Sequence, residues 1–157
     1  MDIFKVVELN KFEEYIKLIN ASTLNTVDEH YQHNLLQTAI VENSIEIGLD
    51  LISKGIDINH QDINGLTPLH YAAEYNALKL ATAIIMNGGD VNIQNKYGNN
   101  ALWTATFNTR DDYRLLELYI SAGGNPHHKN LNGKSSLDFA LQVGDDKRIE
   151  ILRSKNR

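Results

Sequence analysis

Residues 62–73 read DINGLTPLHYAA, and this stretch decides the fold. Gly65 tolerates the positive φ angle of a tight turn, and Thr67 can cap a helix because its hydroxyl accepts a hydrogen bond from a free backbone N–H. Pro68 follows at the first helical position, where its missing N–H costs nothing. Leu69 and the small apolar residues after it form a narrow stripe at helical spacing. The stretch therefore predicts a turn followed by a helix that neighbouring helices can approach closely.

The same pattern recurs along the chain. Glycine, leucine and alanine keep their relative positions at offsets of 33 and then 35 residues, in the sets Gly65, Leu69 and Ala72, then Gly98, Leu102 and Ala105, then Gly133, Leu137 and Ala140. Two extra residues near Thr109–Asp112 account for the longer offset. Residues 78–86 predict a second, more apolar helix that ends at a glycine cap, Gly88. Each unit is thus expected to be a helix, a short turn, a second helix and a hairpin-like loop, and stacking buries the face that one unit alone leaves exposed.

These residues resemble the ankyrin repeat, whose T-P-L-H-x-A signature is matched by residues 67–72. The resemblance implies an all-α fold: an ankyrin-repeat solenoid of stacked helix-turn-helix units with hairpin-like loops, forming one domain over residues 1–157. We expect an N-terminal cap at 1–27, repeats at about 28–60, 61–93 and 94–128, and a C-terminal cap at 129–157. The residues that carry the structural motif are Gly65, Thr67, Pro68, Leu69, His70, Gly88, Gly98 and Gly133.

The outer units depart from the signature. Gln32 stands where the turn glycine is expected, and the position of Thr67 is taken by Asn34, Asn100 and Ser135 in the other units. Each of these three side chains can still cap a helix, so the architecture should survive. Capping units also need a polar outer face, which explains degenerate sequences at the ends of an array.

Composition narrows the classes of function. The chain has 157 residues, 15 basic against 20 acidic side chains and a formal net charge of -5, which argues against nucleic acid or an anionic membrane as a partner. The absence of cysteine excludes disulfides, thiolate metal sites and cysteine nucleophiles, and it is compatible with a reducing cytoplasm, where we expect the protein to act. The sequence shows no signal peptide and no apolar run of the roughly 20 residues that cross a membrane.

The search for chemistry predicts neither an enzyme nor a metal or cofactor site. The chain has six histidines, but His127 and His128 are adjacent and so rarely face one metal, while His30, His33 and His60 fall in predicted loops as surface residues. His70 belongs to the motif and is expected to hydrogen-bond locally. The glycine pair at 88–89 recurs at 123–124, as a helix cap does, and no phosphate-binding loop or catalytic motif is present.

The resemblance also implies where a protein partner binds, because ankyrin repeats use the loop tips and the exposed side of each first helix, which together form a concave face. Carried onto this sequence, the predicted binding face consists of Tyr31, His33, Ile63, Leu66, Glu74, Tyr75, Lys96, Tyr97, Trp103, Phe107 and Asn108. Apart from Trp103, six of these are large apolar or aromatic residues at positions that the fold does not need to bury, which favours an interface over isolated exposed residues. Trp103 replaces the motif histidine, and either partial burial or an anchoring role fits it.

The favoured function is a protein-binding module that acts as a stoichiometric inhibitor of a partner such as a bacterial toxin or another enzyme, since similar arrays occur among immunity proteins. A structural scaffold or assembly subunit and a secreted host-interacting effector remain as alternatives, and an enzyme or ligand-binding protein is disfavoured. We expect the free protein to be a monomer.

Overall fold

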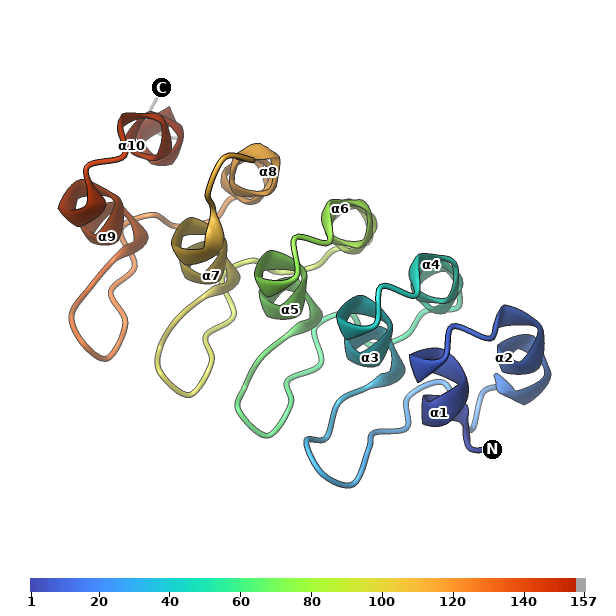
Figure 1. Cartoon of the computed structure of the whole chain (residues 1–157). Helices are drawn as coiled ribbons and strands as arrows, with labels where there is room; N and C mark the ends of the chain where they lie inside the picture. The colour runs from blue at the N-terminus through green and yellow to red at the C-terminus, as the bar shows by residue number, and fades with distance from the viewer. Residues whose placement is uncertain (155–157) are drawn as a thin grey trace.

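The computed structural model describes residues 1–154 and arranges them as helix pairs stacked in a single row (Figure 1). The first helices of the pairs are α1 (Ile3–Glu8), α3 (Leu35–Val41), α5 (Pro68–Glu74), α7 (Ala101–Asn108) and α9 (Ser136–Val143). The second helices are α2 (Phe12–Leu18), α4 (Ile45–Ser53), α6 (Leu78–Met86), α8 (Arg114–Ser121) and α10 (Asp146–Arg153). The all-α prediction is confirmed. Each unit predicted from the sequence contains one helix pair, and we therefore propose the same bounds for the two caps and the three repeats. The end of the C-terminal cap, 155–157, lies outside the described residues.

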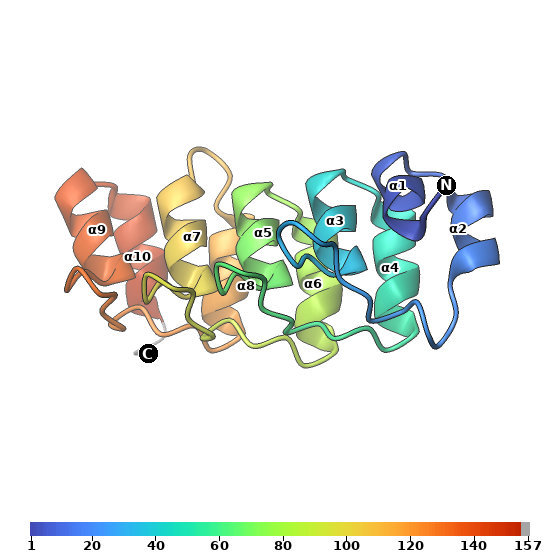
Figure 2. The same ribbon diagram turned by 90° about the horizontal axis from the view of Figure 1, so that it is seen from below.

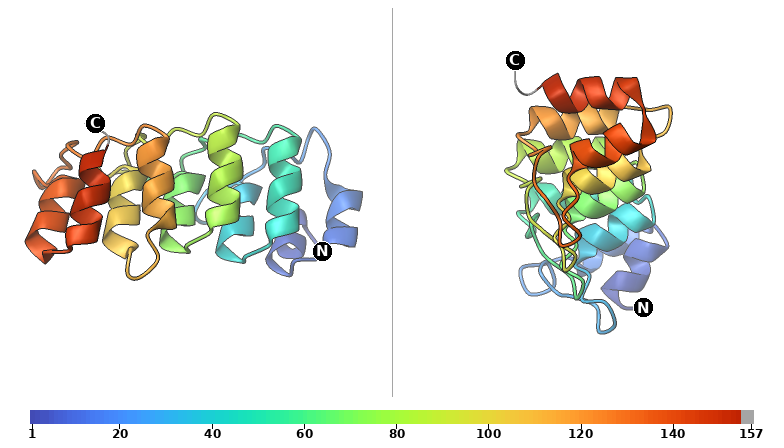
Figure 3. Two further views of the ribbon diagram at one scale, coloured as in Figure 1. Left: turned by 90° about the horizontal axis from the view of Figure 1, so that it is seen from above. Right: turned by 90° about the vertical axis from the view of Figure 1, so that its left-hand side faces the viewer.

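The pairs form two layers of helices, with the loops projecting to one side. First helices lie beside first helices and second helices beside second helices, as Figures 1 and 2 show from two directions. The long loops between pairs extend beyond the layer of first helices, and the end-on view in Figure 3 shows them aligned along the row. The loop tips and the first helices therefore share one side of the molecule.

A continuous apolar core fills the space between the two layers. The motif leucines Leu36, Leu69 and Leu102 are fully buried on the first helices, and Ile47 and Leu80 meet them from the second helices. The alanine at the third core position, such as Ala72, leaves room for neighbouring first helices to pack closely. Because the main contacts between helices of residues 1–154 join helices of the same or of adjacent pairs, the core extends along the row rather than around a centre.

The first helices begin as the sequence predicts. Thr67 caps α5 and Pro68 occupies its first position, while Asn34, Asn100 and Ser135 cap the equivalent helices through side-chain oxygens that accept from backbone N–H groups. The caps satisfy donors that would otherwise be left unpaired at the start of each helix.

The turns inside the pairs share a feature that the sequence analysis did not identify. Asn10, Asn43 and Asn76 have φ angles of 51°, 54° and 52°, and Gly144 has 74° at the corresponding turn of the last pair. Asparagine is one of the few residues that adopts this left-handed conformation at modest cost. The pair α7–α8 differs because its longer linker contains the two extra residues.

Candidate protein-binding face

One polar side chain organises each loop tip. Asp62, Asn95 and Asn130 each accept backbone N–H groups two and four residues further on, so that the loop closes on its own side chain. In the first loop Asp28 accepts the N–H groups of His30, Tyr31 and His33. Burial alone would raise the pKa of Asp28, but these three donors stabilise the carboxylate and hold its pKa below the ordinary value.

Neighbouring loop tips are joined by backbone hydrogen bonds. Ile63 N–H donates to the Tyr31 carbonyl at 3.0 Å. The same contact recurs from Lys96 to Asn64 at 2.9 Å and from Leu131 to Tyr97 at 3.1 Å. The side chains at the tips are therefore held at a regular spacing along the row, which reduces the entropy that binding would otherwise cost.

His70 connects the start of α5 to the next loop. Its Nδ1 accepts the Thr67 backbone N–H at 3.1 Å, and its Nε2 lies 3.0 Å from the Asn99 carbonyl, which fixes the Nε2–H tautomer. The imidazole is fully buried, and burial lowers its pKa below the ordinary value because the charged form would lose its hydration. Gln37 makes the equivalent contacts one unit earlier, to the Asn34 N–H and the Leu66 carbonyl.

Most of the predicted binding face is exposed. Phe107 and Tyr31 keep 60% and 59% of their surface in contact with solvent, which is far more than a core aromatic residue keeps. The other exposed members of the set are Ile63, Glu74, Tyr75, Lys96, Tyr97 and Asn108, whereas His33 and Trp103 are half-buried.

The position of Leu66 differs from the expectation that the fold does not need to bury any of these residues. Its side chain is half-buried against the core, because its backbone lies in the neck of the loop. The Leu66 N–H donates to Asp62, and its carbonyl accepts from Gln37 and from the Asp62 N–H. Because the side chain is partly buried against the core, Leu66 supports the tip rather than extending it.

At the N-terminal end of the face, aromatic rings from the first loop and α5 form a row. The Tyr31 and His33 rings stack with centroids 5.4 Å apart, His33 meets the edge of Tyr71 at 5.1 Å, and Tyr71 stacks on Tyr75 at 6.5 Å. We call these four residues the N-terminal aromatic row. Its outer members are exposed, so the row presents apolar area with a supported geometry.

Polar contacts beneath the row fix its central residues. The Tyr71 hydroxyl donates to the Asp62 carboxylate at 2.6 Å and accepts from His33 Nε2 at 2.8 Å. Burial and the Asp62 carboxylate raise the pKa of Tyr71 well above its ordinary value, so the hydroxyl stays protonated as a donor. The surface assignment of His33 was therefore incomplete, since this ring also joins the first loop to α5.

A second aromatic group lies at the C-terminal end. Trp103 and Phe107 both contact Phe139 of α9, with ring centroids 5.7 Å and 5.3 Å apart. We call these three residues the C-terminal aromatic cluster. The Arg148 guanidinium also packs over the Phe139 ring, with Cζ 5.7 Å from the ring centroid. The structure thus brings Tyr31, His33 and Tyr75 together in one group and Trp103 and Phe107 in another.

Tyr71, Asp62 and Phe139 were not identified from the sequence as parts of this face. Tyr71 lies inside the motif, next to the core residue Ala72, and this position suggests only a role in helix packing. Phe139 falls in the degenerate last unit, although its equivalence to the first-helix positions around Trp103 and Phe107 could have indicated it.

Two of the loop histidines, His60 and His128, contact neighbouring loops instead of being merely solvated. His60 Nε2 donates to the Gln32 carbonyl at 2.7 Å and His128 Nε2 to the Gly98 carbonyl at 2.9 Å. Within residues 1–154 the structure contains no group of three or more His, Asp or Glu side chains placed to hold a metal ion.

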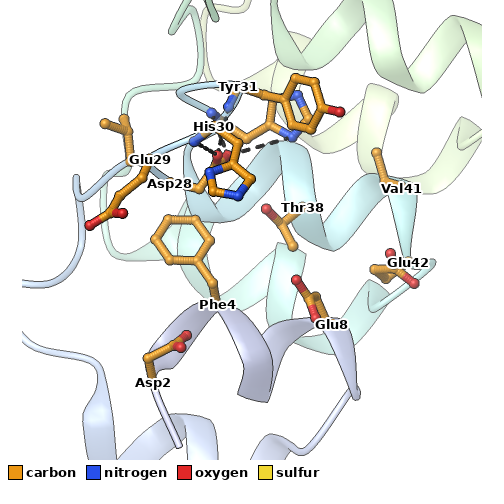
Figure 4. A pocket seen from close by; sticks show the side chains of 12 residues that line it. Asp2, Phe4, Glu8, Asp28, Glu29, His30, Tyr31, Thr38, Val41 and Glu42 are labelled. Atoms are coloured by element: carbon orange, nitrogen blue, oxygen red, sulfur yellow. Dashed lines mark hydrogen bonds and ion pairs between the residues drawn. The ribbon is translucent and has the colours of Figure 1, made fainter.

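A pocket of about 630 Å³ adjoins the N-terminal aromatic row, between α1, the first loop and the end of α3 (Figure 4). Its apolar lining includes Phe4, Val27, Tyr31 and Val41, and its carboxylates include Glu8, Glu29 and Glu42. We call it the N-terminal groove. Volumes of about 300–1,000 Å³ are typical of sites that enclose a small ligand or a side-chain group.

Comparison with known proteins agrees with this architecture. The family model for ankyrin repeats in many copies matches residues 51–105. A "Putative ankyrin repeat protein FPV031" of fowlpox virus is 30% identical over 132 residues, which are 80% of this chain and 38% of the viral protein. The "B-cell lymphoma 3 protein homolog" of Mus musculus is 30% identical over 144 residues, 88% of this chain and 31% of that protein. The chain therefore spans well under half the length of these relatives.

Repeats of this kind indicate a protein–protein interaction module, and such modules are typically non-catalytic. The chain belongs to the ankyrin-repeat family. None of the helices within residues 1–154 is long and apolar enough to cross a membrane.

Proposed function

We propose that this protein is a stoichiometric inhibitor that binds a protein partner across the predicted binding face and covers the partner's active site. The observation that carries the proposal is the pair of aromatic groups at the two ends of that face. One end presents the exposed Tyr31 and Tyr75, and the other presents the exposed Phe107 beside the half-buried Trp103. Aromatic anchors remove much area from water at small entropic cost, and they dominate the energy of many interfaces.

The proposed partner is an enzyme such as a bacterial toxin, encountered in the cytoplasm by a monomeric inhibitor. The formal net charge of -5 favours a partner with a basic surface, since complementary charge speeds association and suppresses wrong partners. A rigid row of loop tips suits occlusion, because a surface that is ordered before binding can block a site without first rearranging.

The test is capture of the partner from an extract of the source cells, followed by calorimetry with purified proteins. We expect one stoichiometric partner, inhibited on binding, and a loss of at least about 100-fold in affinity for the Tyr75→Ala/Phe107→Ala variant, because each truncation of an interface anchor costs roughly 2 kcal/mol or more. Met86→Ala is the matched control, since Met86 is 80% exposed and lies on α6 in the layer of second helices.

Equal affinity of the double variant and the unaltered protein would show that the partner does not bind at the predicted binding face. A stable homo-oligomer in light scattering, with no partner captured, would instead favour a scaffold. Both variants replace exposed side chains, and their circular dichroism and melting temperature should match those of the unaltered protein.

A further inference from the structure

The N-terminal groove combines an apolar floor with a carboxylate rim. In the view of Figure 4, the Phe4 ring lies between Glu29 and Asp2 on one side and Glu8 and Glu42 on the other. Tyr31 and Val41 complete the apolar surface from the first loop and α3. A ligand that fits must therefore offer both an apolar or planar body and a positive charge.

Two carboxylates of this rim, Glu29 and Glu42, have no ion-pair partner among residues 1–154. Lys5 forms an exposed ion pair with Glu8 at 2.8 Å. The Asp28 carboxylate is occupied by the backbone of its own loop. The free carboxylates of the rim remain available to a partner.

Helix geometry adds to the negative potential at this edge. Glu8 is the last residue of α1, Glu42 is the C-cap of α3 and Glu74 is the last residue of α5. The C-terminal end of a helix carries partial negative charge, so an acidic side chain there is unfavourable for the fold. Glu8 is compensated by Lys5 on its own helix, whereas Glu42 has no such ion pair, so the charge of Glu42 complements a basic ligand.

We infer that the N-terminal groove binds an arginine side chain of the protein partner, with the guanidinium against the Glu42 carboxylate, which no described cation pairs with, and its flat face against the Phe4 or Tyr31 ring. Arginine fits better than lysine because its planar fork both stacks on aromatic faces and pairs with two carboxylate oxygens. Its aliphatic stem would lie along Val41 and the apolar floor. This inference rests on the proposed function, since it names the chemistry by which the same partner is recognised.

The test uses N-acetyl-arginine-N-methylamide as the probe, titrated into the isotope-labelled protein and followed by NMR. N-acetyl-citrulline-N-methylamide is the control, because it has nearly the same shape without the charge. We expect saturable shifts of backbone amides around Phe4, Tyr31 and Glu42 with the arginine probe and weaker or unsaturated shifts with citrulline and with the lysine analogue.

Glu42→Gln should weaken binding of the arginine probe roughly tenfold, the effect of losing one charge-assisted hydrogen bond. Glu117→Gln is the matched control, because it makes the same change at an exposed position of α8 away from the groove and should leave the affinity unchanged. The melting temperature of the Glu42→Gln protein should not fall, since the change removes an acid from a helix C-terminus.

The inference is overturned if no saturable shifts occur, if citrulline or lysine binds as well as arginine, or if Glu42→Gln binds the probe as tightly as the unaltered protein. Tyr75 and Phe107 do not line the groove, and the Tyr75→Ala/Phe107→Ala protein should bind the probe normally. Failure of the probe titration therefore leaves the aromatic-face test standing, and failure of that test leaves the groove result standing.

Discussion

At the scale of single residues, the position of His70 shows how one site of the motif can be filled by different chemistry. In α5 an imidazole accepts from the helix cap and donates to the next loop, while in α3 the amide of Gln37 makes both contacts. In α7 the same position is Trp103, which turns to Phe139. The motif histidine is thus a neutral connector whose role depends on keeping Nδ1 unprotonated.

This requirement predicts a dependence of stability on pH. Burial lowers the pKa of His70 from the ordinary 6.5, so below that value the unfolded chain binds a proton that the folded chain resists. The contribution of His70 to the free energy of unfolding should therefore be fully present above pH 6.5, and the free energy of unfolding should decrease as the pH falls below that value. His70→Gln should flatten this decrease, because the amide keeps both contacts and does not titrate.

Urea unfolding at neutral and mildly acidic pH measures this effect, with His127→Gln as the control at an exposed loop position. The same pH dependence in the unaltered protein and in His70→Gln would show that another group is responsible. The aspartates with lowered pKa values, such as Asp28, lose their charge only at pH values below the ordinary 3.8, outside this window.

At the scale of elements, the loops repeat one design in which a single residue of the tip has a positive φ angle. Gly65 and Gly98 adopt φ of 76° and 74°, and a Cβ on either would lie 3.0–3.1 Å from the backbone of the next loop. In the first loop Gln32 holds this position with φ of 57°. A residue with a Cβ is costly there, which makes the first loop the least favourable of the series.

Gln32→Gly should therefore stabilise the protein by roughly 0.5–1 kcal/mol, because relief of the left-handed strain outweighs the greater flexibility of glycine in the unfolded chain. Gly65→Ala at the equivalent position should have the opposite sign, since the new methyl group would press on the Asn95 backbone. Equilibrium unfolding in urea measures both. Equal stability of Gln32→Gly and the unaltered protein would mean that the first loop tolerates this conformation without strain.

The elements also show what a sequence can predict. The first helices and their caps follow from the short-range pattern of Thr67, Pro68 and Leu69, which determines local structure directly. The left-handed turns at Asn10, Asn43 and Asn76 were missed because asparagine only weakly favours that conformation and is common in this chain. The N-terminal groove was missed for a different reason: Phe4 and Glu42 are 38 positions apart, and only the packing of α1 against α3 brings them to one pocket.

At the scale of the whole molecule, stability is a sum over neighbouring pairs, and polar contacts of Arg148 and Asp145 join the last pair to the one before it. Arg148 of α10 is buried, donates to the Thr109 carbonyl of the preceding unit and forms an ion pair with Asp145 at 3.4 Å. Tyr113 in the α7–α8 linker also donates to Asp145, at 3.0 Å. The linker that contains the two extra residues therefore contacts the C-terminal pair through hydrogen bonds at Thr109 and Tyr113.

Arg148→Ala should loosen α9 and α10 without unfolding the rest of the row. Loss of its charge-assisted hydrogen bond should cost about 2 kcal/mol locally, since the buried Thr109 carbonyl loses its donor and Asp145 loses its ion pair. Hydrogen exchange should accelerate in the last pair and remain unchanged in α3–α6, because coupling in repeat arrays runs through adjacent interfaces. Lys147→Ala, at an exposed position of the same helix, is the control. Uniform acceleration along the chain would show that the row unfolds as one unit.

The backbone hydrogen bonds between loop tips make the two ends of the row different for the addition of a further unit. Each later loop donates one N–H to the loop before it, from Ile63, Lys96 and Leu131. In the first loop the equivalent N–H, that of His30, is already bound by Asp28. The last loop has the equivalent carbonyl at Asn132, with no further loop beyond it within residues 1–154. The loop of a unit duplicated after the last one could donate its N–H to the Asn132 carbonyl. A loop placed before the first one could accept the His30 N–H only if it displaced Asp28. Lengthening the array by duplication is therefore easier at the C-terminal end than at the N-terminal end.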